Sequence, residues 1–270
     1  RLPDPGIYHF PREENGGKTR IHLRVDPDGS GLLIVNANRV VHLNPSAAAM
    51  AYLHLEDRPP KEASRALRKQ FQAPSERIAQ DYLDLGEKIE AFLEPNGACP
   101  ICDLDIETTA PFSAKPSAPY RMDLALTYRC NNDCAHCYNA RSRRFPELDQ
   151  KAWKRIIDKV WELRIPHIVF TGGEPTLYNH LPELVAYAEE TGLVTGLNTN
   201  GRKLADRDFL DSLVEAGLDH IQITFESHDP HIHDQMVGAQ GAWQETVTGL
   251  KHALETKLYL MTNTTLLTHN

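Results

Sequence analysis

The sequence predicts an α/β fold in which a partial (β/α)6 TIM-like barrel follows a small α+β domain. Strand and helix patterns alternate from about residue 120 to the end, which is typical of parallel βαβ units. Residues 1–93 instead run as strands followed by helices, and a proline-rich stretch separates the two regions. We therefore predict a first domain at residues 1–93, a linker at 94–119 and the barrel at 120–270.

The first domain begins with short extended segments and ends with helices. Its predicted strands are rich in β-branched residues and are separated by turn signals; they lie at residues 7–10, 21–25, 32–35 and 40–43. Asn44 and Pro45 then start a helix, because proline is favoured in the first helical turn. Apolar residues at helical spacing predict three helices, at residues 47–55, 61–71 and 74–93.

The predicted linker lacks a periodic pattern of apolar residues, whereas the predicted barrel alternates strand and helix patterns. Five prolines interrupt any periodicity in residues 94–119. The predicted barrel strands are residues 121–127, 167–171, 194–199, 220–225 and 258–263, and the helices are residues 151–163, 181–190, 206–216 and 244–255. The chain starts at Arg1 without Met and stops straight after a predicted strand, so we expect that both ends have been trimmed and that the C-terminal part of the barrel is missing.

The composition indicates a cytoplasmic protein that spans no membrane. Hydrophobic residues make up 41% and charged residues 24%, and no apolar run approaches the roughly 20 residues of a membrane helix. The net charge of −8 disfavours nucleic acid as the main partner. No secretory signal opens the chain, and its five cysteines are an odd number, so we expect a reducing compartment.

A cluster of cysteines follows the first barrel strand. Cys130, Cys134 and Cys137 form a CxxxCxxC pattern that can hold one face of a [4Fe–4S] cluster and leave the fourth iron without a protein ligand. Two alternatives remain open: a zinc site with His136 as the fourth ligand, or free thiols in a cytosolic protein. The position of the cysteines after a barrel strand favours a functional role for them, because loops at the carboxyl ends of barrel strands build active sites.

A second loop, after the next strand, carries Gly172, Gly173, Glu174 and Pro175. Glycines let the backbone approach a ligand closely, and a carboxylate beside them can receive an ammonium group. The tetrapeptide alone is a weak signal, because an ordinary turn ending in proline looks the same. Together, the two loops at adjacent strand ends form a strong candidate site.

With these two loops, residues 120–270 resemble the radical S-adenosylmethionine superfamily; His136 and Tyr138 flank the last cysteine, as aromatic residues do in that family. The resemblance implies that the cluster and S-adenosylmethionine (SAM) are the cofactors and that reductive cleavage of SAM yields a 5′-deoxyadenosyl radical, which takes hydrogen from a substrate. It further implies SAM contacts: Glu174 and its neighbours at the amino group, His136 and Tyr138 beside the adenine, and Asn198, Thr224 and Glu226 along the methionyl and ribose parts.

The first domain looks like the winged-helix-like recognition element of peptide-modifying enzymes, which resembles the chaperone of pyrroloquinoline quinone biosynthesis. This implies that it binds the leader of a ribosomally made precursor peptide, with an exposed edge strand within residues 21–41 accepting the leader as an added strand. An electron donor such as flavodoxin or ferredoxin is the other implied partner. The alternatives are an enzyme of the same class acting on a small cofactor precursor, and a non-catalytic peptide-binding module carrying zinc or a cluster.

Two further groups of residues are ambiguous. Cys99 and Cys102 either supply part of an auxiliary iron–sulfur cluster or zinc site, completed by residues beyond Asn270, or form an uninvolved reduced pair. Three histidines lie in what reads as a loop after the fourth barrel strand. For that loop we favour a structural or substrate-facing role over metal binding; the histidines are His228, His231 and His233.

Overall fold

The computed structural model describes residues 1–14, 17–36, 39–94, 117–139, 145–268 and 270. The chain divides into two compact units, unit 1 at Arg1–Pro119 and unit 2 at Tyr120–Asn270, each with its own core. In the described part of the chain, no helix has both the length and the apolar character needed to cross a membrane. Cys99 and Cys102, and most of the predicted linker, lie outside the described residues.

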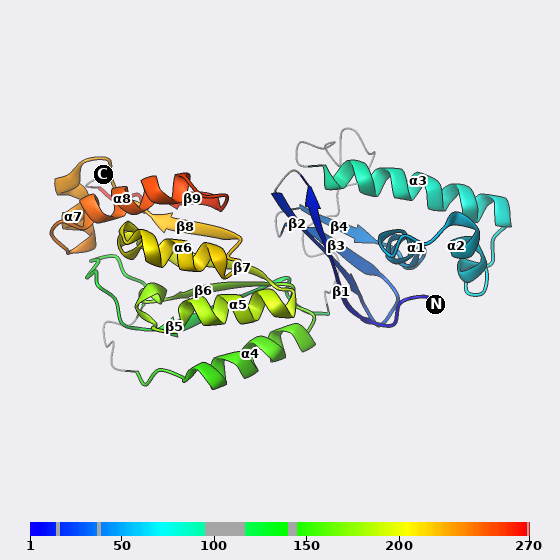
Figure 1. The fold of residues 1–270 in the computed structure, drawn as a ribbon, viewed down its shortest axis with the longest axis horizontal. Coiled ribbons are helices and arrows are strands. Elements are labelled where there is room, and N and C mark those ends of the chain that lie inside the picture. Colours follow the sequence, from blue (N-terminus) through cyan, green and yellow to red (C-terminus); the bar gives the residue numbers. More distant parts are fainter. Residues whose placement is uncertain (15–16, 37–38, 95–116, 140–144, 269) are drawn as a thin grey trace. The chain divides into compact units, whose positions relative to one another are not determined.

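Unit 1 opens with a four-stranded antiparallel sheet whose strands are neighbours in sequence order (Figure 1). The strands are β1 (Gly6–Glu14), β2 (Gly17–Val25), β3 (Gly31–Val35) and β4 (Arg39–Leu43). The predicted turn joins β2 to β3: Gly29 has φ +85°, a conformation that favours glycine, and Asp26 N donates to Ser30 O at 2.8 Å. Within the described residues, β1 and β4 are therefore the edges of this sheet.

Three helices follow the sheet, as the sequence predicts: α1 (Pro45–Leu55), α2 (Pro60–Leu67) and α3 (Ser75–Leu93). Asn44 caps α1 by accepting a hydrogen bond from Ala47 N at 2.9 Å. One apolar cluster joins the inward residues of β2 and β3 to α1 and α3, and a second joins the three helices to one another. The unit is thus α+β, while its likeness to a winged helix remains a prediction.

Unit 2 contains a five-stranded parallel sheet in simple sequence order, the arrangement that closes towards a barrel (Figure 1). Its strands are β5 (Arg121–Thr127), β6 (His167–Gly172), β7 (Val194–Thr199), β8 (His220–Thr224) and β9 (Tyr259–Asn263). The connecting helices are α4 (Gln150–Glu162), α5 (Leu181–Thr191), α6 (Arg207–Glu215) and α8 (Ala242–Leu254). The predicted α/β class and parallel sheet are confirmed, and the carboxyl ends of all five strands meet at one edge.

One helix of unit 2 is absent from our sequence interpretation, which left this segment as a loop. Helix α7 (Pro230–Val237) starts at Asp229, whose carboxylate accepts from His231 N at 2.8 Å and Ile232 N at 3.1 Å. His233 is buried on this helix, and its Nδ1 lies 3.2 Å from Glu226 N. His233 therefore serves the fold, whereas His228 and His231 are exposed and their structural or substrate-facing role stays a prediction.

Candidate active site

The two loops singled out in the sequence pack against each other through their backbones. Gly173 N donates to Thr127 O, and Glu174 N donates to Arg129 O, both at 2.7 Å. Gly172 has φ +137°, and a Cβ atom built on it would lie 2.1 Å from Thr127 O. A Cβ on Gly173 would lie 2.3 Å from Arg129 O. Both glycines are thus required by the contact between the loops, and the predicted close approach of a ligand to them stays a prediction.

Glu174 lies at the centre of this contact and is 1% exposed. Its Oε1 accepts from Thr176 N at 3.1 Å, Thr176 Oγ1 at 2.7 Å and Thr199 Oγ1 at 2.6 Å. Its Oε2 accepts from Asn200 N at 2.8 Å. Burial raises the pKa of this carboxyl, and the four donors act in the opposite direction. The side chain therefore ties the end of β6 to the end of β7.

The three predicted ligand cysteines lie in the loop after β5. Cys130 and Cys134 are half-buried and Cys137 is exposed. The pKa of Cys134 is raised to about 11, first by burial and then by the charges of Cys130, Cys137 and Glu226. The thiol of Cys134 is thus close enough to Cys130 and Cys137 to be influenced by their charges. Three thiolates in such a loop repel one another until a cationic centre binds between them, so the donor set fits an iron–sulfur cluster.

The zinc alternative required His136 as a fourth ligand, and the described structure does not form it. Among the described residues, no three His, Cys, Asp or Glu side chains are placed to hold one metal ion. Nε2 of His136 lies 3.0 Å from Glu226 Oε1, while its buried Nδ1 has no hydrogen-bond partner among the residues that the structure describes. A cubane presents its irons at separate corners, so its ligands need not converge on one point.

Glu226 connects the cysteine loop to the ends of the last two strands. Besides His136, its carboxylate accepts from Thr265 N at 2.8 Å, and its side chain is fully buried. Its own N–H lies 3.2 Å from Nδ1 of His233 on α7. The predicted SAM contact Glu226 is therefore also a structural residue that holds His136 in one orientation.

The remaining predicted contacts differ in exposure. Asn198 and Thr224 are half-buried near the carboxyl ends of β7 and β8, and Pro175 is buried at the start of a short 3-10 helix. Tyr138 is 88% exposed beside the last cysteine. The structure thus places all of these residues in loops or strand ends at one edge of the sheet, and their SAM contacts remain predictions.

Sequence reasoning missed the residue that fastens the cysteine loop. Arg202, in the short helix after β7, donates through Nη1 to Asn131 O at 2.5 Å and to Asn132 Oδ1 at 2.8 Å. Its Nε donates to Glu245 Oε2 on α8 at 2.5 Å. Asn200 adds a side-chain hydrogen bond to Asn131 at 2.6 Å. The cysteine loop is therefore held from the side of β7 and α8.

Replacing Arg202 with alanine is expected to loosen this loop without unfolding the unit. The change removes two hydrogen bonds to the loop, worth on the order of 1–3 kcal/mol together, so amide exchange across residues 130–138 should accelerate by about tenfold or more. Hydrogen–deuterium exchange with mass spectrometry checks this in metal-free protein. Arg207→Ala is the control, because the ion pairs of Arg207 lie on exposed surface. Unchanged exchange at the loop in Arg202→Ala would contradict the assignment.

Comparison with known proteins identifies the family of this site. The Radical SAM superfamily matches residues 124–270. The chain is 37% identical over 132 residues to the Fe-coproporphyrin III synthase of Methanosarcina barkeri. The matched stretch covers 48% of this chain and 33% of that protein. It is 33% identical over 147 residues to the PqqA peptide cyclase of Bradyrhizobium diazoefficiens, covering 54% of this chain and 38% of the relative. The chain thus spans about a third of the length of these curated relatives.

Solved structures show the same fold over a longer stretch. Streptococcus suis SuiB bound to S-adenosylmethionine has a TM-score of 0.63 at 16% identity, covering 90% of this chain and 55% of that chain. SuiB bound to precursor peptide SuiA gives 0.59 at 17% identity, with the same coverage. The family match covers more than half of the chain and includes the segments that follow β5, β6, β7 and β8 at the strand-end edge. On that basis, the chain belongs to the radical SAM superfamily.

Proposed function

We propose that the chain is part of a radical SAM enzyme that abstracts hydrogen from a ribosomally made precursor peptide. Its superfamily uses a [4Fe–4S] cluster and SAM as cofactors. When bound, they supply the 5′-deoxyadenosyl radical by reductive cleavage of SAM. A flavodoxin- or ferredoxin-like electron donor in a reducing cytoplasm completes the proposal.

The cysteine loop supplies the cluster ligands in this proposal. The ligands of three irons are Cys130, Cys134 and Cys137. The charges of Cys130 and Cys137 raise the pKa of Cys134, which supports this grouping. Glu226 fixes the ring of His136 through Nε2, which leaves the buried Nδ1 to face a bound cofactor. A buried polar atom without a partner is costly in a folded protein, so an acceptor or donor from SAM would stabilise it.

The other strand-end loops position SAM. The loop from Gly172 to Pro175 lies against the start of the cysteine loop, so its backbone is beside the first ligand Cys130. We assign the amino group of SAM to this loop. The side chain of Glu174 shapes the loop through its four hydrogen bonds, and Asn198 and Thr224 line the neighbouring strand ends.

Unit 1 provides the peptide-recognition site in this proposal. Strand β4 (Arg39–Leu43) is the sheet edge that overlaps the predicted residues 21–41, and Val40 on it is 37% exposed. Arg39 fastens β4 to the C-terminal end of α3 by donating to Phe92 O at 2.6 Å and Glu94 O at 2.8 Å. A rigid edge strand with free backbone groups is suited to accept the leader as an additional strand.

The observation that favours a peptide substrate is the extent of the structural likeness. The sequence matches to the coproporphyrin synthase and the peptide cyclase are about as long as unit 2 alone. The likeness to SuiB covers 90% of the chain and so reaches into unit 1. A small cofactor precursor remains the second candidate, because the coproporphyrin synthase has the higher sequence identity of the two curated relatives.

Anaerobic reconstitution with iron and sulfide, followed by dithionite and SAM, is expected to release 5′-deoxyadenosine and methionine in equal amounts. High-performance liquid chromatography measures both products. Coexpression with a short precursor peptide should then give a mass change in that peptide, which separates the two substrate classes. A fully loaded cluster that releases no 5′-deoxyadenosine would refute the proposed chemistry.

A further inference from the structure

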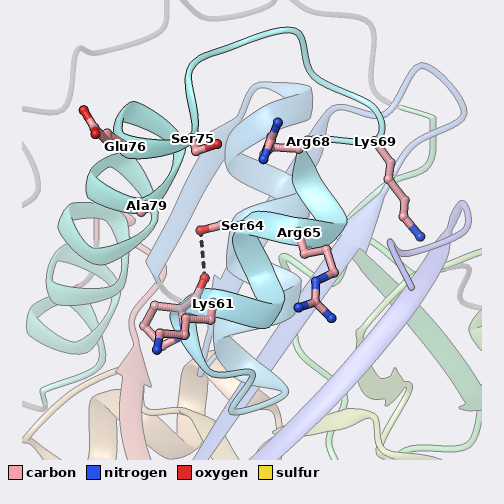
Figure 2. A pocket seen from close by; sticks show the side chains of 9 residues that line it. Lys61, Ser64, Arg65, Arg68, Lys69, Ser75, Glu76 and Ala79 are labelled. Carbon is pink, nitrogen blue, oxygen red and sulfur yellow. Dashed lines mark hydrogen bonds between the residues drawn. The ribbon is translucent and has the colours of Figure 1, made fainter.

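A basic groove lies between α2 and α3 of unit 1, away from the sheet edge assigned to the leader. Its volume is about 720 Å³, and it is open to solvent on one side. Figure 2 shows residues of α2 along one wall and the first turns of α3 along the other. We define this basic groove by its lining residues: Pro60, Lys61, Ser64, Arg65, Arg68, Lys69, Ser75, Glu76 and Ala79.

The cations of the groove lie on α2 and just beyond its end. Lys61 and Arg65 are four residues apart on α2, Arg68 is the C-cap residue three positions later, and Lys69 follows directly. The opposite face of α2 packs into the helical core. All four charged side chains are exposed, and the described structure shows no ion pair or hydrogen bond for any of their charged groups. Glu76 is the single acid among the lining residues.

Helix stability does not account for these cations. Like charges four residues apart, such as Lys61 and Arg65, destabilise a helix. Cations near a helix C-terminus are favourable, which suits Arg65 and Arg68. Lys61, however, lies in the first turn of α2, where the positive end of the helix dipole disfavours a cation. In a chain with a net charge of −8, four unpaired cations around one cavity indicate an anionic occupant.

The second wall presents further donors to the same cavity. Helix α3 begins after Pro74, whose side chain caps no N–H group. The hydroxyl of Ser75 lies on this first turn, on the other side of the groove from Ser64 (Figure 2). Ser64 donates to Pro60 O at 2.7 Å, which keeps its side chain within α2. The groove thus combines cationic side chains with the hydroxyl of Ser75 and small lining residues.

We propose that the basic groove docks an acidic segment of a polypeptide partner. Carboxylates match the planar guanidinium groups of Arg65 and Arg68, which can each bind two oxygens. No aromatic side chain lines the groove, so it lacks the stacking platform that single-stranded nucleic acids use. A concave surface on an acidic chain is also poorly suited to a flat anionic membrane. The groove acts independently of the radical chemistry proposed for unit 2.

The test uses a short fluorescein-labelled peptide that alternates Glu and Ser, and a second peptide with Gln in place of each Glu. Fluorescence anisotropy measures the binding of each peptide to the full chain. The parent should bind the Glu peptide more tightly, with an affinity that falls as salt rises. The Arg65→Glu, Arg68→Glu double variant should bind it at least about tenfold more weakly. The matched control reverses two exposed cations on α4, Lys151→Glu and Arg155→Glu, and should stay within about twofold of the parent.

A second, milder variant tests whether weaker binding by the first variant is caused by unfolding. Lys61→Ala with Lys69→Ala removes two charges without introducing acids, and should weaken binding by about threefold with an unchanged melting temperature. The proposal is overturned by equal affinity for the Glu and Gln peptides, or by an equal loss in the α4 control. It is also overturned by complete displacement of the peptide with an equal concentration of inorganic phosphate, which would assign the groove to a free anion.

Discussion

Replacing Cys134 with alanine is expected to lower 5′-deoxyadenosine formation by at least about a hundredfold. Residues that only support a metal ligand already change metal affinity or activity by about 10- to 100-fold, so loss of a ligand should exceed that range. Cys134 is half-buried at the centre of the loop, and its pKa reports the proximity of Cys130 and Cys137. With one ligand absent, the two remaining thiolates cannot retain the cluster.

Iron and sulfide analysis and the visible absorbance of the anaerobic protein measure the loss directly. The control is the double variant Cys99→Ala, Cys102→Ala, which removes the two cysteines that do not belong to the CxxxCxxC pattern. It should keep the absorbance of the first cluster and continue to form 5′-deoxyadenosine. If the control loses product formation while Cys134→Ala retains it, the assignment of the ligands would be wrong.

The sequence predicts much of this architecture because local signals agree with the final fold. Alternating strand and helix patterns give all five parallel strands of unit 2, and Asn44 caps the helix that it was expected to start. The candidate site is predicted for a related reason. Loops that follow consecutive parallel strands must meet at one edge, so CxxxCxxC and GGEP are brought together by the topology alone.

Other features depend on contacts between segments far apart in the sequence. Arg202 fastens the cysteine loop from 70 residues away, and no local pattern marks it. No local pattern shows that Cβ atoms on Gly172 and Gly173 would meet the backbone of residues 127–129. Helix α7 had a detectable signal, the Asp229-Pro230 pair, which is typical of a helix start.

Glu174→Ala tests how far a family motif residue serves the fold. We expect the variant to lose on the order of 3–5 kcal/mol of unfolding free energy, because the change leaves buried donors at Thr176, Thr199 and Asn200 without an acceptor. In a unit of this size, that loss corresponds to a fall in melting temperature of roughly 10 °C or more. Circular dichroism or differential scanning fluorimetry of the metal-free protein measures it without SAM.

The control is Glu183→Ala on α5, whose carboxylate is 52% exposed and pairs only with His180 in the described structure. It should change the unfolding free energy by less than about 0.5 kcal/mol. Glu174→Gln separates the structural role of the side chain from a role in SAM binding. The amide keeps the shape of the side chain, but its NH2 group cannot accept hydrogen bonds from Thr176, Thr199 or Asn200. If Glu174→Ala melts like the parent yet binds SAM more weakly, the carboxylate acts on the cofactor and the structural role is wrong. If both substitutions destabilise the metal-free unit, the role of the glutamate is to join β6 to β7, and the backbone of the loop is left to contact SAM.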